Sequence, residues 1–355
     1  MKTIGKSTYT EAQKSEMKRQ IRHAADDAFD KEMAEINEQL NKEILIALVG
    51  DVNAGKSSTI NRIVGEEVAG VGAEPGETTA IHPHAYKDKI FFIDTPGLND
   101  VNKENSATTL DYFRKTDVVL FFLNAAGTVF SESEQRSFRI VEKANPNILI
   151  VLNKIDAADE VDRLVSRVRR ETGQKYDVIP ISSRTGENVD TLRDAILELL
   201  KKNNKDILFA RTIKEKSSIA NKWIIAASTS AGAIGAVPLP GADIVPLTAL
   251  QIGLLTKLAT LYERPISREA AKEIVITAIV GNLGRTIFSQ IVKFFPGAGS
   301  VAAAGVAGTV TLALGYSVKY AYERGIDVTP ESVSKLYKTF RDRKDKGKKI
   351  PGEPE

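Results

Sequence analysis

The chain has 355 residues, enough for two domains with separate cores, and its 42% hydrophobic and 27% charged residues exclude a largely disordered protein. The net charge of +3 is too small to indicate nucleic-acid binding, and the absence of cysteine excludes disulfides and thiolate metal sites. The amino-terminal residues lack the apolar core of a signal peptide, so we expect a cytoplasmic protein.

The first predicted element is a long amphipathic helix within residues 1–43. Apolar residues recur there at intervals of three or four, and polar residues fill the other faces. The apolar positions are Met17, Ile21, Ala25, Phe29, Met33, Ile36 and Leu40.

Residues 44–203 alternate continuous apolar runs with helical patterns. The runs predict strands over 44–49, 89–94, 117–123, 147–153 and 176–181. The helical patterns lie near 131–143, 158–171 and 187–202. This alternation predicts an α/β domain with a doubly wound, mostly parallel sheet covered on both faces.

The composition changes after about residue 205, where Ala, Gly, Ile, Leu and Val dominate. Two stretches without charge, Trp223–Ala242 and Phe294–Val318, each contain a Pro-Gly turn. We expect an all-α apolar domain over 204–328, built from two helix–PG–helix units. Residues 329–355 form a basic tail that we expect to be partly disordered, with eight Lys or Arg and two Asp over 335–350.

A candidate phosphate-binding loop follows the first predicted strand. Residues 50–58 read GDVNAGKSS, and a helical pattern comes next, so G-x(4)-G-K-S stands between a strand and a helix. Backbone N–H groups of such a loop point at phosphate oxygens. Lys56 would reach the β- and γ-phosphates, and Ser57 would offer its hydroxyl to Mg²⁺. The other expected contacts are Asp51, Val52, Asn53, Ala54, Gly55 and Ser58.

Further motifs follow later strands. In DTPG, Asp94 would hold a Mg²⁺-bound water and the Gly97 N–H would meet the γ-phosphate. In NKID, Asp156 can accept from guanine N1–H and the exocyclic amine, while Asn153 and Lys154 would brace the loop and the base. The last strand is followed by Ser182, Ser183 and Arg184, whose backbone could donate to guanine O6. Ligands bind at the carboxyl ends of strands in such sheets, so these motifs predict GTP as the nucleotide.

On these motifs, with PGETTA at 75–80 and ISSRTGENVDTL at 181–192, residues 44–202 resemble the translation-factor-class GTPases of the Era/TrmE group. The resemblance implies that a threonine coordinates Mg²⁺ through its hydroxyl, with Thr79 the first choice and Thr78 the second. It also implies GTP hydrolysis, with Lys56, Thr79 and Gly97 at the reacting phosphate.

Two departures bear on the mechanism. Leu98 follows DTPG, where Ras-like proteins place a glutamine that orients the attacking water. In Era/TrmE-like proteins, an asparagine at the loop position of Asn53 accompanies a bound K⁺. Asn53 is therefore expected either to bind K⁺ or only to cap the loop. We expect His82 and His84 to be residues of an edge strand around Pro83. The alternative is that His82 takes the catalytic place of the missing glutamine.

The apolar half has its own resemblance. Residues 218–325 are similar to the C-terminal domain of the YcjF-like GTPases, on the pattern PLPGAD followed by QIGLLTKLATLYE. The layout also resembles that of dynamin-like and immunity-related GTPases. Two alternatives are open: a soluble helical bundle that includes the amino-terminal helix, or insertion or peripheral docking at the cytoplasmic face of an anionic membrane, assisted by the basic tail.

We therefore expect a GTP-hydrolysing switch that couples its nucleotide state to the apolar domain, at a membrane or through a homodimer. One alternative is an RNA or ribosome assembly GTPase of the Era kind, which is less favoured because the chain shows no KH-type GxxG in a basic, β-containing domain. Another is a binding module with negligible turnover, favoured by Leu98. No DNA partner is expected.

Overall fold

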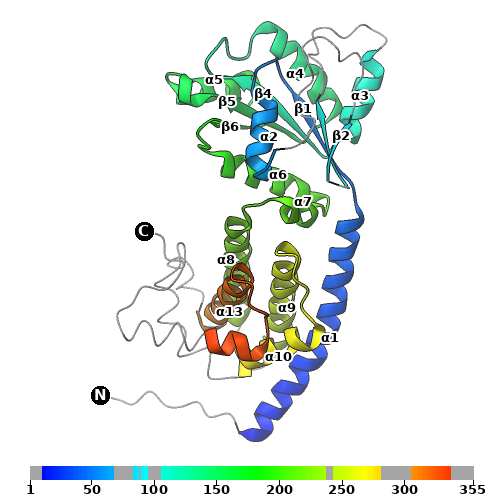
Figure 1. The fold of residues 1–355 in the computed structure, drawn as a ribbon, viewed down its shortest axis with the longest axis vertical. Coiled ribbons are helices and arrows are strands. Elements are labelled where there is room, and N and C mark those ends of the chain that lie inside the picture. The colour runs from blue at the N-terminus through cyan, green and yellow to red at the C-terminus, as the bar shows by residue number, and fades with distance from the viewer. Residues whose placement is uncertain are drawn as a thin grey trace, which may run out of the picture. The chain divides into compact units, whose positions relative to one another are not determined.

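The computed structural model describes residues 10–67, 83–87, 89–94, 105–236, 243–280 and 305–336. The chain divides into two compact units. One, the nucleotide unit, contains residues 38–215; the other, the helical unit, contains residues 1–37 and 216–355. Figure 1 shows the sheet with its helices in the nucleotide unit, and helices in the other.

A six-stranded sheet forms the centre of the nucleotide unit, in the order β2-β3-β1-β4-β5-β6. All neighbouring pairs are parallel except β2 and β3, which are antiparallel. The strands are β1 (Ile44–Val49), β2 (Pro83–Lys87), β3 (Ile90–Asp94), β4 (Val118–Asn124), β5 (Ile148–Asn153) and β6 (Asp177–Pro180). The predicted α/β class with a mostly parallel sheet is confirmed, and His84 lies in the edge strand β2.

Helices cover both faces of the sheet. One hydrophobic core lies on the face that packs against α3 (Asn105–Lys115), α4 (Glu132–Ala144) and α5 (Val161–Glu171), where Phe113, Phe121 and Phe138 are buried. Helices α2 (Lys56–Val64) and α6 (Val189–Lys202) contact each other, and α6 also contacts β4 and β5. Since β4 and β5 are buried almost throughout, the continuous apolar strands of the sequence are explained.

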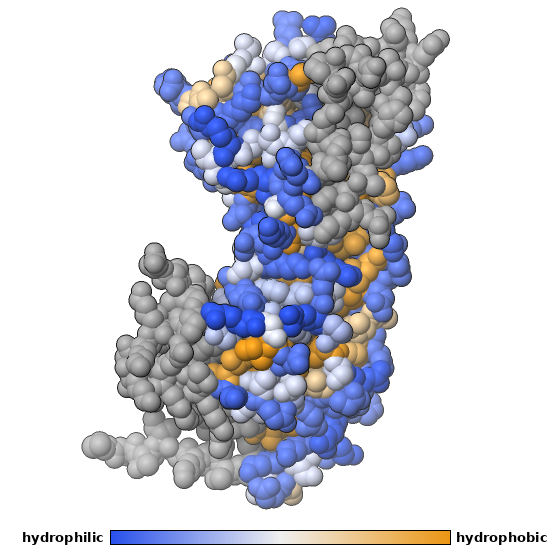
Figure 2. Space-filling model, in the orientation of Figure 1, coloured by the Kyte–Doolittle hydropathy of each residue, from blue (hydrophilic) through white to orange (hydrophobic). Residues whose placement is uncertain are grey.

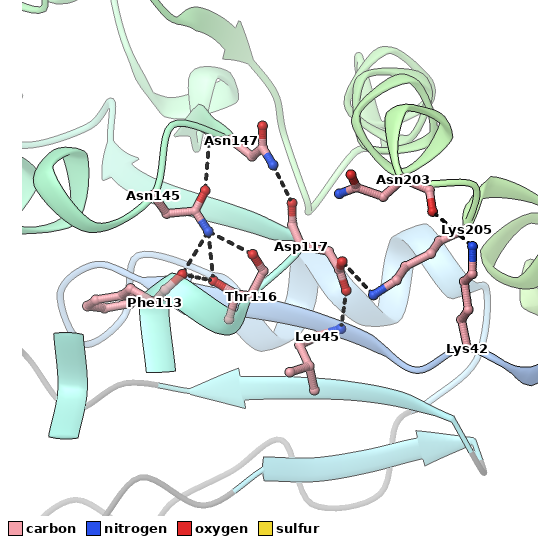
Figure 3. Close-up of polar contacts among 9 residues, drawn as sticks. All are labelled: Lys42, Leu45, Phe113, Thr116, Asp117, Asn145, Asn147, Asn203 and Lys205. Carbon is pink, nitrogen blue, oxygen red and sulfur yellow. Dashed lines mark hydrogen bonds and ion pairs between the residues drawn. The ribbon is translucent and has the colours of Figure 1, made fainter. Parts of the chain in front are cut away.

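A polar cluster lies at the end of the sheet where the parallel strands β1, β4 and β5 begin (Figure 3). Asp117 accepts from the Leu45 N–H at 2.9 Å and from Lys205 Nζ at 2.6 Å. Beside it, Asn145 Nδ2 donates to the carbonyls of Phe113 and Thr116, both at 2.7 Å. These bonds tie the start of β4 to β1 and to the residue that precedes α7 (Asp206–Thr212).

Helix α7 belongs to the nucleotide unit, although the sequence placed residues 204–215 with the apolar domain. Besides the Lys205–Asp117 pair, the Lys214 N–H donates to the Val64 carbonyl at 3.1 Å. The Ile207 N–H also donates to Gln39 Oε1 at 3.3 Å. These contacts group residues up to 215 with the sheet.

The described part of the helical unit contains most of α1 (Glu11–Asn41) together with α8 (Lys216–Gly235), α9 (Ile244–Leu261), α10 (Arg268–Val280) and α13 (Gly305–Glu323). Small residues let α8 and α13 pack closely. A Cβ built on Gly315 would lie 2.7 Å from Ile224, and one on Gly235 would lie 2.7 Å from Ala307. A buried hydrogen bond from Gln251 Nε2 to Thr311 Oγ1 at 3.0 Å joins α9 to α13.

Ion pairs attach α1 to the other helices of this unit. Asp26 pairs with Lys272 at 2.5 Å, and the Arg268 guanidinium pairs with Asp30 and lies over the Phe29 ring. In the same part of α1, the apolar residues Ile21, Ala24, Ala25 and Ala28 are buried. The amphipathic helix predicted within 1–43 is therefore present, and it packs as a member of the helical unit.

Among the described residues, one helix has the length and composition of a membrane span, α9, and 67% of it is buried within the structure. A mostly buried core helix passes the same test, so α9 is weak evidence for a span. Among the residues that Figure 2 colours, hydrophilic ones predominate, with apolar residues between them. Large hydrophobic side chains exposed in the described part are Val52, Ile140 and Val245.

Candidate nucleotide-binding site

The loop between β1 and α2 has the backbone of a phosphate cradle. Gly50 adopts a φ of 147°, and a Cβ at this position would lie 2.7 Å from the Phe122 carbonyl oxygen. Gly55 adopts a φ of 87°, and a Cβ there would lie 2.1 Å from Asn153 Nδ2. Glycine is required at both positions, so that the loop can turn tightly against β4 and β5.

The phosphate end of the site is formed where β1 and β3 finish. Lys56 Nζ donates to the carbonyls of Gly50 at 2.9 Å and Asp51 at 3.3 Å, which places its ammonium group over the loop. Ser57 lies in the first turn of α2, whose N-terminal N–H groups favour anions. Asp94 ends β3 and pairs in register with Leu48 of β1, so its backbone lies at the same edge of the sheet.

Asn153, at the end of β5, joins the phosphate loop to the loops that follow β5 and β6. Its side chain is fully buried. Nδ2 donates to the Ala54 carbonyl at 2.9 Å and to Ser183 Oγ at 3.2 Å, while Oδ1 accepts from the N–H groups of Lys154 and Ser183 at 2.8 and 3.0 Å. Lys154 adopts a φ of 66°, and the next residue starts a turn of 3-10 helix. One amide thus fixes three loops relative to one another.

Asp156 lies in that turn, beside the loop that follows β6. Its Oδ1 accepts from Ser182 Oγ at 2.5 Å, and its Oδ2 pairs with Arg184 Nη2 at 2.5 Å. The hydrogen bond from Ser182, together with the Arg184 guanidinium, lowers the pKa of the Asp156 carboxyl below its ordinary value. Asp156 is therefore an anion at neutral pH, with both carboxylate oxygens available as hydrogen-bond acceptors.

A capping box at the start of α4 lies near the phosphate loop, and it was not singled out in the sequence. The Ser131 N–H donates to Glu134 Oε2 at 2.6 Å, and Ser131 Oγ accepts from the Glu134 N–H at 3.3 Å. Burial raises the pKa of Glu134, and the charge of Asp51 adds to this effect. The spacing Ser-x-x-Glu before a helical pattern is the signal that could have found it.

Some predicted site residues lie outside the described part of the chain. These are Thr78, Thr79, His82, Gly97 and Leu98; of Asp94 and His84 only the backbone is described. The structure brings together the phosphate loop, NKID and Ser182 to Arg184 at one edge of the sheet. In the described part no group of three His, Cys, Asp or Glu side chains could hold a metal ion by itself.

A loop with glycines at its two tight turns between β1 and α2, in contact with the loops that follow β5 and β6, defines a P-loop nucleotide-binding protein. Residues 45–154 match the protein family described as 50S ribosome-binding GTPase. The chain is 30% identical over 172 residues to a probable GTP-binding protein EngB of Thermotoga petrophila, covering 44% of this chain and 87% of that one. It is 27% identical over 196 residues to GTPase Era of Clostridioides difficile, covering 49% of this chain and 66% of that one.

The chain belongs to the family of EngB-type P-loop GTP-binding proteins. A crystal structure of a probable GTP-binding protein engB matches 44% of this chain and 99% of that one, with 21% identity and a TM-score of 0.37. The chain spans about half the length of the Era and Der relatives that it matches. The family match covers residues 45–154, which lie within the nucleotide unit.

Proposed function

We propose that the protein binds GTP with Mg²⁺ and hydrolyses it slowly, as a switch whose nucleotide state is coupled to the helical unit. The observation that carries this proposal is the buried Asn153 side chain. It joins the phosphate loop through the Ala54 carbonyl to the base-recognition loop through Ser183. A site with this connection can hold a triphosphate and a guanine base at the same time.

Each end of the nucleotide would meet residues suited to it. The Lys56 ammonium would neutralise charge on the β- and γ-phosphates, and the N-terminus of α2 would add N–H donors. At the other end, the Asp156 carboxylate would accept from guanine N1–H and the exocyclic amine. The Ser182 and Ser183 N–H groups already donate to the Glu187 carbonyl and to Asn153 Oδ1, so the Arg184 N–H is the proposed donor to O6. Adenine lacks the N1–H and carries an amine in place of O6, so it satisfies neither demand.

Oxygen donors at the phosphate end fit Mg²⁺. Ser57 would hold the ion through its hydroxyl, Asp94 through a bound water, and Thr79 through its hydroxyl. The β1–β3 register supports a common position for Ser57 and Asp94, because Asp94 ends β3 beside Leu48, and β1 leads through the phosphate loop to Ser57 at the start of α2. When bound, Mg²⁺ neutralises charge that develops on the phosphate oxygens.

Single-turnover hydrolysis of GTP tests the enzymatic proposal. Wild-type protein should convert GTP to GDP and phosphate, and Lys56→Met should lose the activity while retaining its far-ultraviolet circular dichroism. Tight GTP binding without turnover would instead favour a binding module, as Leu98 suggests. Repeating the assay over a range of protein concentrations detects activation by a homodimer. The turnover rate per protein molecule rises with protein concentration if a dimer is the active form, and it is constant if the monomer is.

We extend the proposal to a K⁺ ion held by Asn53. This residue is exposed in the phosphate loop with a φ of 66°, where a cation could face the phosphates. K⁺ would supply positive charge that Leu98 cannot. GTP turnover should then be faster in KCl than in NaCl at equal ionic strength, and Asn53→Ala should remove the difference. Equal rates of GTP turnover in KCl and NaCl would refute the proposed K⁺ site.

The nucleotide state is proposed to act on the helical unit. The apolar composition of residues 204–328 and the basic tail support docking at the cytoplasmic face of a membrane, to which the mostly buried helix α9 adds only weak evidence. Flotation with anionic liposomes, with GTP or GDP, tests this role. Protein that stays in the soluble fraction under all conditions would leave a helical bundle without membrane contact.

A second candidate is ribosome or RNA assembly. The family description, 50S ribosome-binding GTPase, and the Era relatives favour it. Co-sedimentation with 50S subunits, compared with 30S subunits and liposomes, distinguishes it from membrane docking. Binding to 50S subunits that requires GTP would support this candidate.

A further inference from the structure

The strongest unexplained contact in the site is the ion pair between Arg184 and Asp156. Arg184 Nη2 lies 2.5 Å from Asp156 Oδ2, and the Arg184 side chain is 76% exposed while that of Asp156 is 12% exposed. The guanidinium therefore reaches from the surface to the oxygen that guanine would use. We propose that Arg184 competes with the guanine base for Asp156 and so lowers the affinity and the association rate of guanine nucleotides.

The competition follows from how little of the carboxylate is accessible. Ser182 Oγ already donates to Oδ1 at 2.5 Å, and the two donors of guanine need both oxygens. Guanidinium and guanine are both planar donors that would approach Oδ2 from the open side. A side chain that is only 12% exposed leaves little room for both at once.

The backbone of the loop does not need to move when Arg184 releases Asp156. The Arg184 carbonyl accepts from Arg62 Nη2 at 3.3 Å, which ties the loop to α2. The Thr185 N–H donates to Ser182 Oγ at 3.1 Å, and the Gly186 N–H donates to the Ser182 carbonyl at 2.8 Å. These bonds hold the loop without the Arg184 side chain. Rotation of that exposed side chain is therefore enough to free the Asp156 carboxylate.

This inference rests on the proposed function, because it assumes that guanine binds at Asp156. Exposed ion pairs are weak, and the apparent affinity falls in proportion to the fraction of molecules with a free carboxylate. The expected effect is therefore modest. Arg184→Gln should bind GDP about twofold to fivefold more tightly than the wild type. The gain should lie in the association rate, with the dissociation rate unchanged, because the pair exists only before guanine binds.

Stopped-flow binding of a fluorescent GDP analogue, with calorimetry of unlabelled GDP, tests the inference. Arg184→Lys keeps a cation and should stay within about twofold of the wild type. Arg19→Gln is the matched control. Arg19 is 80% exposed and pairs with Glu16 at 2.8 Å on α1, in the other unit, so its loss should leave GDP binding unchanged. Raising NaCl should narrow the difference between wild type and Arg184→Gln.

The outcomes separate the two proposals. If the wild type does not bind GDP, or binds ADP equally well, the proposed function fails. If the wild type binds GDP selectively but Arg184→Gln binds it no more tightly, the competition is refuted. Weaker binding by Arg184→Gln with faster dissociation would instead show that Arg184 holds the bound nucleotide.

Discussion

The buried ion pair at the base of the sheet allows a prediction of stability. Lys205 Nζ lies 2.6 Å from Asp117 Oδ1, and the two side chains are 20% and 8% exposed. Lys205→Met keeps most of the apolar stem but removes the cation, so the Asp117 carboxylate is left buried with one remaining donor, the Leu45 N–H at 2.9 Å.

The expected loss of stability is about 3 kcal/mol. Removing one partner of a buried pair costs about 3–5 kcal/mol, and the retained bond from Leu45 together with the partly exposed lysine favours the lower end of that range. In a unit of this size, this loss should lower the unfolding temperature by about 6–12 °C. Urea unfolding followed by far-ultraviolet circular dichroism, without nucleotide, measures the free energy.

Two further variants test whether the cost comes from the orphaned charge. Combining Lys205→Met with Asp117→Asn removes both charges and should recover stability to within about 1 kcal/mol of the wild type. Lys202→Met changes an exposed lysine at the end of α6 and should cost less than about 0.5 kcal/mol. A Lys205→Met variant as stable as the wild type, or a double variant no better than the single one, would refute the reasoning.

Three further predictions concern other side chains. Asn153→Ala removes the bond to the Ala54 carbonyl and should destabilise the fold by about 1–3 kcal/mol. It should also weaken GDP binding, measured by calorimetry, at least about tenfold. Unchanged GDP affinity would contradict the central role of this amide. Ser131→Ala removes the side-chain half of the capping box and should cost about 1 kcal/mol in urea unfolding, and a neutral result would show that the cap is unimportant. Burial raises the pKa of Tyr316 to about 12, above its ordinary value of 10.0, so its ionisation opposes folding and stability present below pH 10 is lost as the pH rises through about 12. Tyr316→Phe should shift alkaline unfolding, followed by circular dichroism, to higher pH; an identical midpoint would contradict this.

Much of the nucleotide unit could be predicted because its strands are buried on both faces. The runs at 44–49 and 147–153 are continuously apolar, and they form β1 and β5 within one residue of the expected bounds. Helix α3 was missed because NSATTLDYFRK mixes polar and β-branched residues without a clear apolar stripe. Helix α7 was missed because seven residues are too few for a helical period to be recognised.

The contacts that shape the site could not be predicted, because they join residues far apart in the chain. Asn153 bonds to Ala54, 99 positions away, and the sequence indicated only that it would brace the loop. The sequence treated residues 182–184 as backbone donors, whereas the structure shows that the Arg184 side chain reaches Asp156. Whether a side chain turns back toward a neighbouring loop depends on loop geometry, which residue types do not specify.

Calorimetric titration of the purified chain with GDP and with ADP, each with Mg²⁺, tests the central claim most directly. The account predicts that GDP binds, that ADP binds at least about 1,000-fold more weakly, and that Asp156→Asn loses this preference. Equal binding of ADP and GDP by the wild type, or no binding of either, would contradict it.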